Sequence, residues 1–484
     1  MAAALSGVLA YVGCGLLGFI GAPRLFSLLA LLTGGGTLLL WAPGFPETLV
    51  GGLPWGIAVA GDAWAVGVWA LGLVLHAALL LHAWAKDRAF HPLSTVLIGA
   101  CLAGSLSRDL FNLYVLMDLT SLLALVLIAS GRRVRAVWAG LQYLVLTEVG
   151  LTLYLFGLGL VYARLGTLSI STIAGRGADL SDPALVVGIG LLVAGAAVKT
   201  GVFPLGLWLP QAHGHAPTEV SALLSGIVVK IGVVTLARLS EAFPVGNLLV
   251  VMGVVTGFGG LLYALWETDL KVFLAFHTVS QLGYMLLGLG LGAGSGARLY
   301  VVAHGLFKGL LFLAAGEAVD RVGRRAIADL AGKLSLPVAV GLGVGAWAIA
   351  GLPPLAGFAA KGALAQGAPA WAKGVFYALG LGTAASFSKL IPLLRPRGPG
   401  PLGGLPVLAG AVAALGVGGT LLTEGLLSVQ VWGEAILVAG VGYGLYRGLR
   451  RVCPPLPRWG FDWSVASLLT AAVGVVGLVV LGRL

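Results

Sequence analysis

The sequence contains few charged residues. Only 10% of its 484 residues are Asp, Glu, Lys or Arg, whereas a soluble domain has about 25%. No polar segment is longer than about 20 residues, which leaves no room for a sizeable soluble domain. Instead, 59% of the residues are hydrophobic, and the mean hydropathy is +1.02. Apolar stretches long enough to cross a bilayer recur along the whole chain. We therefore predict an all-α polytopic membrane protein.

Cysteine is also scarce. Cys14, Cys101 and Cys453 lie far apart and form no C-x-x-C pair, which argues against iron–sulfur or disulfide chemistry. The glycine-rich segment at 288–296, "GLGLGAGSG", follows no strand. It is interpreted as the end of a packed helix and not as a nucleotide-binding loop. We expect no cofactor and no structural metal.

The formal net charge of +11 is compatible in principle with a nucleic-acid partner. In so apolar a chain it is better explained by membrane orientation, because cytoplasmic loops are rich in Lys and Arg. The N-terminus lacks a basic region before its apolar run and is interpreted as a first span, not as a signal peptide. We predict a multi-pass protein of the cell (inner) membrane, with both termini outside. Its expected surroundings are the lipid bilayer, and we expect no nucleic-acid partner.

Apolar segments predict about 14–16 transmembrane helices. The sixteen candidate spans are 3–20, 25–41, 63–85, 93–106, 110–129, 137–162, 184–203, 217–239, 247–265, 271–292, 299–317, 335–352, 371–393, 405–423, 433–449 and 465–482. Glycine accounts for 77 residues, and small residues allow helices to approach closely. We expect a tightly packed bundle.

Two of the apolar segments contain internal breaks. Pro204 and Pro210 interrupt one, and "GLPPLAGFAAK" at 351–361 interrupts the other. Proline removes a backbone donor and clashes with the preceding turn, so broken helices belong inside a bundle or beside a water-filled cavity. Pro204 and Pro354 are 150 residues apart. Corresponding broken helices in two halves are typical of inverted-repeat transporters.

Several lysines lie within or beside the spans. They are Lys199, Lys230, Lys308, Lys361 and Lys389. Insertion scales assign a lysine at a helix centre a cost of about 2.5–3.5 kcal/mol. A lysine can also snorkel or pair structurally, which suits Lys389 near a helix end. Because burial disfavours the charged form and a nearby carboxylate favours it, a buried lysine can release a proton when its partner moves away.

Few acids are available to pair with these lysines. Asp118 and Glu148 are the two carboxylates that lie deep within long apolar runs. Four histidines add groups that titrate near neutral pH: His213 and His215 beside the first break, and His277 and His304 in later spans. They indicate a proton path. The His-x-His motif together with Glu219 is also compatible with a metal site. Single histidines are also compatible with a structural role, as buried residues whose ring nitrogens are hydrogen-bonded.

Four segments in this order resemble one known family: "AVKTGVFPLGLWLPQAHGHAPTEVSALLSGIVVK", "TDLKVFLAFHTVSQLGYMLLGLG", "AHGLFKGLLFLAAG" and "GLPPLAGFAAK". This is the antiporter-like membrane subunit family shared by Mrp sodium/proton antiporters, respiratory complex I and membrane-bound hydrogenases. Within it the sequence is most similar to the D-type subunits of Mrp antiporters. The resemblance covers about residues 90–395.

The resemblance implies two inverted five-helix repeats, each with a broken helix. It places N-terminal helices at 1–90, the repeats at 91–240 and 241–400, and further helices at 401–484. It also implies proton translocation along Lys199, Lys230, His304, Lys308 and Lys361, with a carboxylate pairing the first lysine. That carboxylate is usually glutamate in the family, but Asp118 stands here, one methylene shorter. Glu148 is a second candidate for this pairing.

The predicted function is that of a proton-translocating component of a multi-subunit Mrp-type Na+/H+ antiporter. It is expected to work together with sister membrane subunits and not to be an enzyme by itself. One alternative is a pumping component of a complex I-like NADH:quinone oxidoreductase or membrane-bound hydrogenase. A related complex for carbon uptake is another. The alternative of a different class is a structural scaffold without transport. Lysine and histidine relays carry protons, whereas sodium prefers oxygen ligands, so the sequence leaves open whether Na+ passes through this chain.

Overall fold

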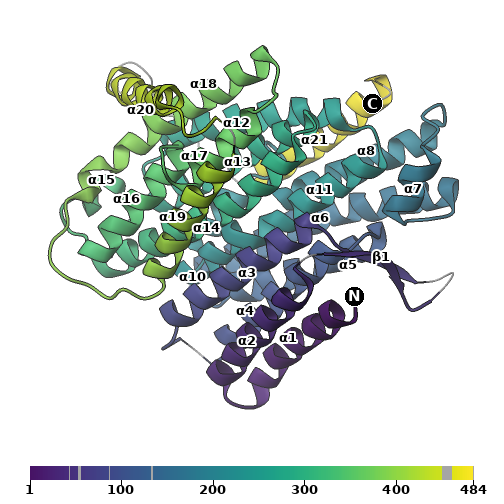
Figure 1. Ribbon diagram of the computed structural model, residues 1–484, viewed down its shortest axis with the longest axis horizontal. Coiled ribbons are helices and arrows are strands. Elements are labelled where there is room, and N and C mark those ends of the chain that lie inside the picture. The colour runs from purple at the N-terminus through teal and green to yellow at the C-terminus, as the bar shows by residue number, and fades with distance from the viewer. Residues whose placement is uncertain are drawn as a thin grey trace.

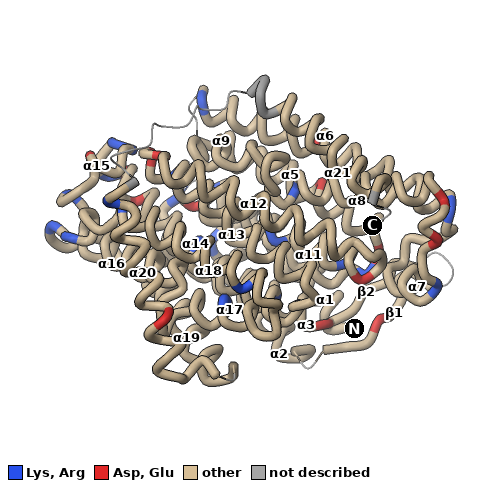
Figure 2. The backbone as a smooth tube through the Cα atoms, turned by 90° about the horizontal axis from the view of Figure 1, so that it is seen from above, with Lys and Arg blue, Asp and Glu red and all other residues tan. Residues whose placement is uncertain are grey.

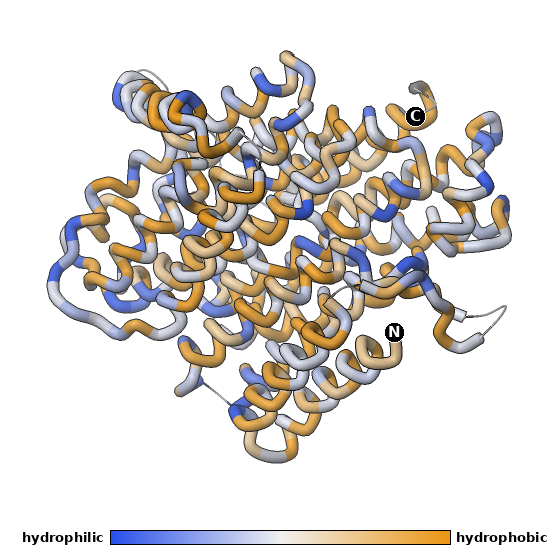
Figure 3. The backbone as a smooth tube through the Cα atoms, viewed as in Figure 1, coloured by the Kyte–Doolittle hydropathy of each residue, from blue (hydrophilic) through white to orange (hydrophobic). Residues whose placement is uncertain are grey.

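A computed structural model of the chain describes residues 1–42, 44–52, 56–86, 88–131, 134–423, 425–449 and 461–482. The described chain is a bundle of long helices that lie side by side (Figure 1). Hydrophobic residues follow the helices for most of their length, and hydrophilic residues gather mainly at helix ends and connections (Figure 3). This pattern suits a bundle that spans a bilayer.

Within the described residues, twelve helices are long and apolar enough to cross a membrane, and three shorter helices are also apolar. All sixteen predicted spans are helical, with ends that differ by a few residues. They are α1 (Ala2–Ile20), α2 (Pro23–Trp41), α3 (Ala63–His82), α4 (Phe90–Leu106), α5 (Leu110–Ala129), α6 (Val134–Leu165), α8 (Pro183–Thr200), the continuous α10 (Thr218–Leu223), η1 (Leu224–Val228) and α11 (Val229–Ala242), α12 (Gly246–Trp266), α13 (Leu270–Gly290), α14 (Gly294–Val322), α16 (Leu336–Ala350), α18 (Ala370–Phe387) with η2 (Ser388–Leu394), α19 (Leu405–Leu422), α20 (Val429–Leu449) and α21 (Phe461–Gly482).

Helix α20 differs from the other predicted spans. It is not among the twelve long apolar helices or the three shorter ones, because Gln430, Glu434 and Arg447 lower its hydropathy. It packs on α18, where the Tyr377 hydroxyl donates to Glu434 Oε2 at 2.9 Å. The helix predicted at 433–449 is therefore present, but it is more polar than its neighbours.

The structure also contains elements that hydropathy did not predict. Strands β1 (Phe45–Val50) and β2 (Ile57–Gly61) form an antiparallel hairpin between α2 and α3. The additional short helices are α7 (Ile170–Arg176), α9 (Trp208–His215), α15 (Ile327–Leu330) and α17 (Ala356–Ala365). The hairpin and α7 lie at one end of the bundle, and α15 lies at the opposite end (Figure 1). We call these the hairpin end and the α15 end.

Both predicted breaks are present, and they share one backbone design. Helix α8 stops at Gly201 and α16 stops at Gly351, each of which has the left-handed conformation with φ of 92° and 79°. A cis proline follows in each case, at Pro204 and Pro354. The chain then resumes as α9 and α17. Glycine adopts this conformation without the steric cost of a Cβ atom, so the breaks are encoded by glycine together with proline.

A second matched feature shows that the two halves are inverted. Leu110 N donates to Leu168 O at 3.0 Å and forms a short bridge at the start of α5. Leu270 N donates to Arg325 O at 2.9 Å and forms the same bridge at the start of α13. The first bridge lies beside α7 at the hairpin end and the second beside α15 (Figure 1). Five crossings separate the two sites, so the second repeat runs through the bilayer in the opposite direction.

The chain ends lie on one side of the bundle. Helix α1 begins and α21 ends toward the hairpin end (Figure 1), as expected for an even number of crossings. Viewed from above, charged residues are concentrated near the two ends of the bundle, with a smaller number in the interior (Figure 2). Among the predicted lysines, Lys199, Lys230 and Lys308 are buried.

Glycines determine how closely α12 and α13 pack. A Cβ atom added at Gly283 would collide with the backbone of Gly257, and one at Gly253 would collide with the backbone of Leu287. Backbone cannot move aside as a flexible side chain can. The helices approach this closely only because both surfaces lack side chains at these positions.

We expect Gly283→Val to push α12 from α13 and to lower the melting temperature of the purified protein. Overpacking typically costs about 1–3 kcal/mol, and a clash with backbone lies at the upper end of that range. The matched control is Gly159→Val on the exposed face of α6, where a Cβ atom meets nothing within 4 Å. Equal melting temperatures for the two variants would contradict this account.

Candidate functional site

Lys199 is buried at the end of α8, two residues before the left-handed Gly201. Its side chain is only 1% exposed. Lys199 Nζ donates to Ser121 Oγ at 2.6 Å and to the Tyr143 hydroxyl at 3.2 Å, and it lies 5.8 Å from the centre of the Tyr143 ring. Helices α5 and α6 therefore supply neutral oxygen acceptors to this lysine.

Asp118 and Glu148 lie near Lys199 but do not contact it. No carboxylate of the described residues forms an ion pair with Lys199 within 4.0 Å. Both acids interact electrostatically with the lysine at longer range. They are half-buried on α5 and α6 and lie close to each other. We call Asp118 and Glu148 the carboxyl pair.

Lys230, His304 and Lys308 form a second group, and all three are fully buried. Lys230 Nζ and His304 Nδ1 are hydrogen-bonded at 2.5 Å, and Lys230 also donates to the carbonyl of Ser225. Ser225 lies in the π-helical turn η1, where the backbone pattern shifts. Such turns often occur at functional sites. Lys308 lies one turn after His304 on α14 and donates to the carbonyl of Leu274.

Lys361 lies in the second broken helix. Its Nζ donates to Ile349 O at 2.7 Å and lies 4.9 Å from the centre of the Tyr284 ring. With Gly201 matched to Gly351, the position equivalent to Lys199 is Ile349. In the second repeat the lysine therefore follows the break. Lys361 reaches back and donates to the carbonyl of Ile349, which precedes the break.

The four predicted histidines have different environments. His213 is fully buried, stacks 4.3 Å from Phe312, and neither of its ring nitrogens has a protein partner among the described residues. His215 is exposed at the end of α9. His277 Nε2 is hydrogen-bonded to Ser386 Oγ at 2.6 Å, and its Nδ1 is unpaired within the described chain. Since buried polar atoms normally have partners, water is the expected partner of His213 and His277.

The two histidines of the His-x-His motif have different surroundings. His213 points into the bundle core and His215 lies at the surface, so the two do not face one ligand. In the described residues, no group of three or more His, Cys, Asp or Glu side chains is placed to hold a metal ion.

Sequence reasoning did not identify several polar residues of this region. Ser121 and Tyr143 are the direct partners of Lys199 and look ordinary in sequence. Lys271 was not among the residues that the sequence singled out. Asp269 caps the start of α13, and Lys271 lies inside the helix, 5% exposed. Its Nζ is hydrogen-bonded to the carbonyl of Ala216 at 2.5 Å. Lys389 donates to Ala264 O at 2.7 Å and to Glu267 O at 3.0 Å, and so caps the end of α12.

A separate ionic cluster closes the hairpin end of the first repeat. Arg238 is fully buried, and its Nη1 lies 2.6 Å from Asp62 Oδ2 and 3.0 Å from Glu241 Oε1. Arg108 pairs with Glu241 and, at 3.2 Å, with Glu47 of β1. Burial raises the pKa of Asp62, but the hydrogen bond and charge of Arg238 more than offset this and hold the pKa below its ordinary value. Arg238, which the sequence did not single out, belongs to this cluster.

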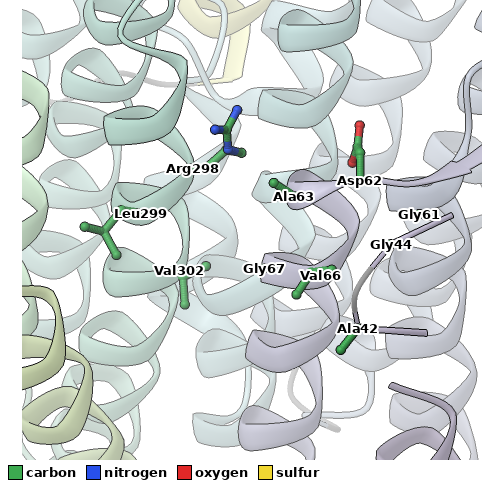
Figure 4. A pocket seen from close by; sticks show the side chains of 10 residues that line it. All are labelled: Ala42, Gly44, Gly61, Asp62, Ala63, Val66, Gly67, Arg298, Leu299 and Val302. Atoms are coloured by element: carbon green, nitrogen blue, oxygen red, sulfur yellow. The ribbon is translucent and has the colours of Figure 1, made fainter. Parts of the chain in front are cut away.

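A cavity of about 490 Å³ adjoins this cluster between α3, α14 and the hairpin. Figure 4 shows Asp62 and Arg298 at one end of it and the apolar Val66, Leu299 and Val302 along its wall. None of the predicted proton-path residues lines this cavity. The lysine and histidine groups are therefore packed inside the bundle and apart from the cavity.

Comparison with known proteins identifies similar chains. A family model described as "NADH:quinone oxidoreductase/Mrp antiporter, TM" matches residues 107–387. The N-type subunit of the NADH-quinone oxidoreductase of Desulforudis audaxviator is 33% identical, over 80% of this chain and 85% of that protein. The D-type subunit of the Na(+)/H(+) antiporter of Alkalihalophilus pseudofirmus is 29% identical, over 64% of this chain and 67% of that protein. In the structure of the Mrp complex from Dietzia sp. DQ12-45-1b, one chain matches with a TM-score of 0.78 and 27% identity, covering 97% of this chain and 60% of that chain. The resemblance inferred from the four sequence segments is confirmed.

We expect Asp62→Asn to lower the melting temperature, because it leaves the buried Arg238 without its closest carboxylate. Breaking a buried ion pair typically costs about 3–5 kcal/mol, and the partial exposure of Asp62 reduces this figure. The folded pKa of Asp62 is depressed, so its stabilisation is present above the ordinary pKa of about 3.9 and is lost as the pH falls through the folded value. The control is Asp179→Asn at an exposed turn. A wild-type melting temperature for Asp62→Asn at pH 7 would contradict the assigned role.

Proposed function

Because the chain belongs to the membrane-subunit family that NADH:quinone oxidoreductases and Mrp antiporters share, we propose that it is the proton-translocating subunit of an Mrp-type Na+/H+ antiporter. The observation that carries the proposal is the hydrogen bond between Lys230 and His304 at the centre of a row of lysines and histidines, in which Lys230, His304 and Lys308 are fully buried. Burial disfavours the charged form of a lysine, so a buried lysine can release its proton to a neighbouring acceptor.

The two repeats, assigned to 91–240 and 241–400, each contribute part of this path. Lys199, Asp118 and Glu148 belong to the first, whereas His304, Lys308 and Lys361 belong to the second, and the Lys230–His304 bond crosses between them. A proton held at Lys199 moves toward Lys230 and His304, and then past Lys308 to Lys361. His213 and His277, with unpaired ring nitrogens, contribute the water-filled connections. His215 lies at the α15 end, where α9 meets Arg325.

Sister membrane subunits fit the surface of the chain. The outer faces of α5 and α6 expose large apolar side chains, among them Phe111, Leu122, Trp138 and Phe156. Asp118 and Glu148 are half-buried on the same two helices. Lipid tails suit the apolar side chains but not the carboxyl pair. A neighbouring protein chain that covers these helices would complete the polar surroundings of the pair.

A second candidate is a pumping subunit of a redox-driven complex. It is favoured by the similarity to the N-type subunit of an NADH-quinone oxidoreductase, which extends over 80% of this chain. The buried residues would perform the same proton transfers in either complex. What differs is the source of energy, which lies in the other subunits.

Lys199→Met should abolish proton exchange by the assembled complex, because methionine fills the site but carries no proton. The measurement is Na+-driven proton movement in sealed vesicles without an electron donor. Lys373→Met on the exposed face of α18 is the matched control and should retain the wild-type rate. A wild-type rate of exchange in Lys199→Met would contradict the proposal and favour the alternative that the chain is a structural scaffold without transport. Proton movement that requires an electron donor in the wild type would point to the redox-driven candidate.

Replacing the carboxyl pair tests which acid controls Lys199. Asp118→Asn should leave the complex assembled but nearly abolish coupled transport, and Asp118→Glu should retain much of it because the charge is kept. Glu148→Gln should have a milder effect. Two unit charges 4 Å apart at an effective dielectric of 20 interact by about 4 kcal/mol, which is an upper bound for the longer distance between Lys199 and these acids. Moving one charge through 100 mV involves about 2.3 kcal/mol, which is of the same order.

Vesicle transport rates, normalised to assembled complex, distinguish the outcomes. A wild-type rate in Asp118→Asn together with loss in Glu148→Gln would transfer the role to Glu148. Wild-type rates in both variants would exclude electrostatic control of Lys199 by this pair.

A further inference from the structure

We propose that the first four helices hold a second proton-conducting branch, centred on His76, that leads from the α15 end of the bundle to Lys199. The inference rests on the proposed proton transport by Lys199 and adds an entry route to it. The residues of this branch lie before or at the start of the first repeat and are separate from the Lys230–His304 row.

The centre of the branch is a hydrogen-bonded cluster contributed by α1, α2, α3 and α4. His76 Nδ1 is bonded to the Tyr11 hydroxyl, and His76 Nε2 is bonded to Ser27 Oγ at 2.7 Å. Thr95 Oγ1 lies 3.1 Å from Ser27 Oγ and 3.5 Å from His76 Nε2. All four side chains are at most 2% exposed. Polar groups so deep in an apolar bundle are costly and commonly functional in membrane proteins.

Each member of the cluster can both donate and accept a hydrogen bond. Imidazole can take a proton on one ring nitrogen while it releases the proton on the other. A hydroxyl can accept a proton from one neighbour as it passes its own to the next. A proton entering through Ser27 would therefore pass through His76 to the Tyr11 hydroxyl, which releases its own proton to water on the route to Lys199. Reorientation then restores every residue to its starting protonation state.

The cluster extends toward the α15 end through His91. This residue lies one turn before Thr95 on α4, is 2% exposed, and its Nε2 has no hydrogen-bond partner among the described residues. His91 interacts electrostatically with His76, Arg24 and Glu219. Glu219 in turn pairs at 3.3 Å with Lys86, whose side chain is 45% exposed. The branch thus reaches water-accessible charges at this end.

On the opposite side, the cluster approaches Lys199 through Cys101. Cys101 lies near Tyr11 and also near Lys199 and its partner Tyr143. Helix α4, which carries Cys101, packs against α5, and Ser121 of α5 is bonded to Lys199. Cys101 is itself buried in α4. The sequence of groups is therefore His91, the His76 cluster, Cys101 and then Lys199, which connects the end of the bundle to its interior.

Tyr11→Phe tests the branch with little change of shape, because it removes only the hydroxyl bonded to His76. In vesicles with assembled complex, we expect proton transport to slow by about tenfold or more, since positioned proton-transfer groups contribute at least this much. The ratio of rates in H2O and D2O should also rise, because proton transfer becomes rate-limiting. Thr95→Val, which breaks the cluster elsewhere, should behave in the same way.

The matched control is Tyr154→Phe. Tyr154 is another fully buried tyrosine, but it donates to Leu110 O at 3.3 Å outside the branch, so its variant should keep the wild-type rate and isotope ratio. The proposal is overturned if Tyr11→Phe and Thr95→Val, per assembled complex, match the wild type in both measurements. Transport that survives in Lys199→Met would instead reject the proposed function. If Lys199→Met loses transport while Tyr11→Phe and Thr95→Val keep the wild-type rate, only the branch is rejected.

Discussion

A buried ammonium group must find hydrogen-bond acceptors inside the bundle, and the architecture of this chain follows from how they are provided. Lys199 uses two hydroxyls, whereas Lys230, Lys271, Lys308 and Lys361 each use a backbone carbonyl. Three of these carbonyls lie where a helix ends or contains a π-turn: Ser225 in η1, Ala216 after α9 and Ile349 before the second break, and the fourth, Leu274, lies within α13. Neutral acceptors stabilise a positive charge without fixing it as a contacting carboxylate would. The second break thus serves Lys361 directly, by supplying its acceptor.

The repeat symmetry of the backbone is not matched by the side chains. The bridges at Asp109 and Asp269 and the turns at Gly201 and Gly351 correspond closely. In contrast, Lys199 corresponds to Ile349, and the carboxyl pair lies on α5 and α6 of the first repeat alone. One scaffold used twice therefore supports two different sets of titratable groups.

The sequence was sufficient for the helices and for the positions of the breaks, because long apolar runs and proline–glycine signals are local. It also identified the buried lysines, since charge within an apolar run is conspicuous. It could not identify their partners. Ser121 and Tyr143 lie 78 and 56 residues from Lys199, and uniformly apolar helices give little periodic signal for which face turns inward. The short helices α9 and α17 and the hairpin were missed because they are too short or too polar to resemble a span.

The close contact of α12 with α13 bears on the speed of the molecule. When two helices meet backbone to backbone, sliding or tilting opens a gap that no side chain can fill. We therefore expect α12 and α13 to move together as one rigid unit. Rigid-body rocking, which many transporters use, takes microseconds to milliseconds. Reorientation of side chains and water around a fixed frame is faster. With this rigid helix pair, rearrangement of side chains and water does not require the helices to move. The slowest step of turnover is then expected in other parts of the assembly.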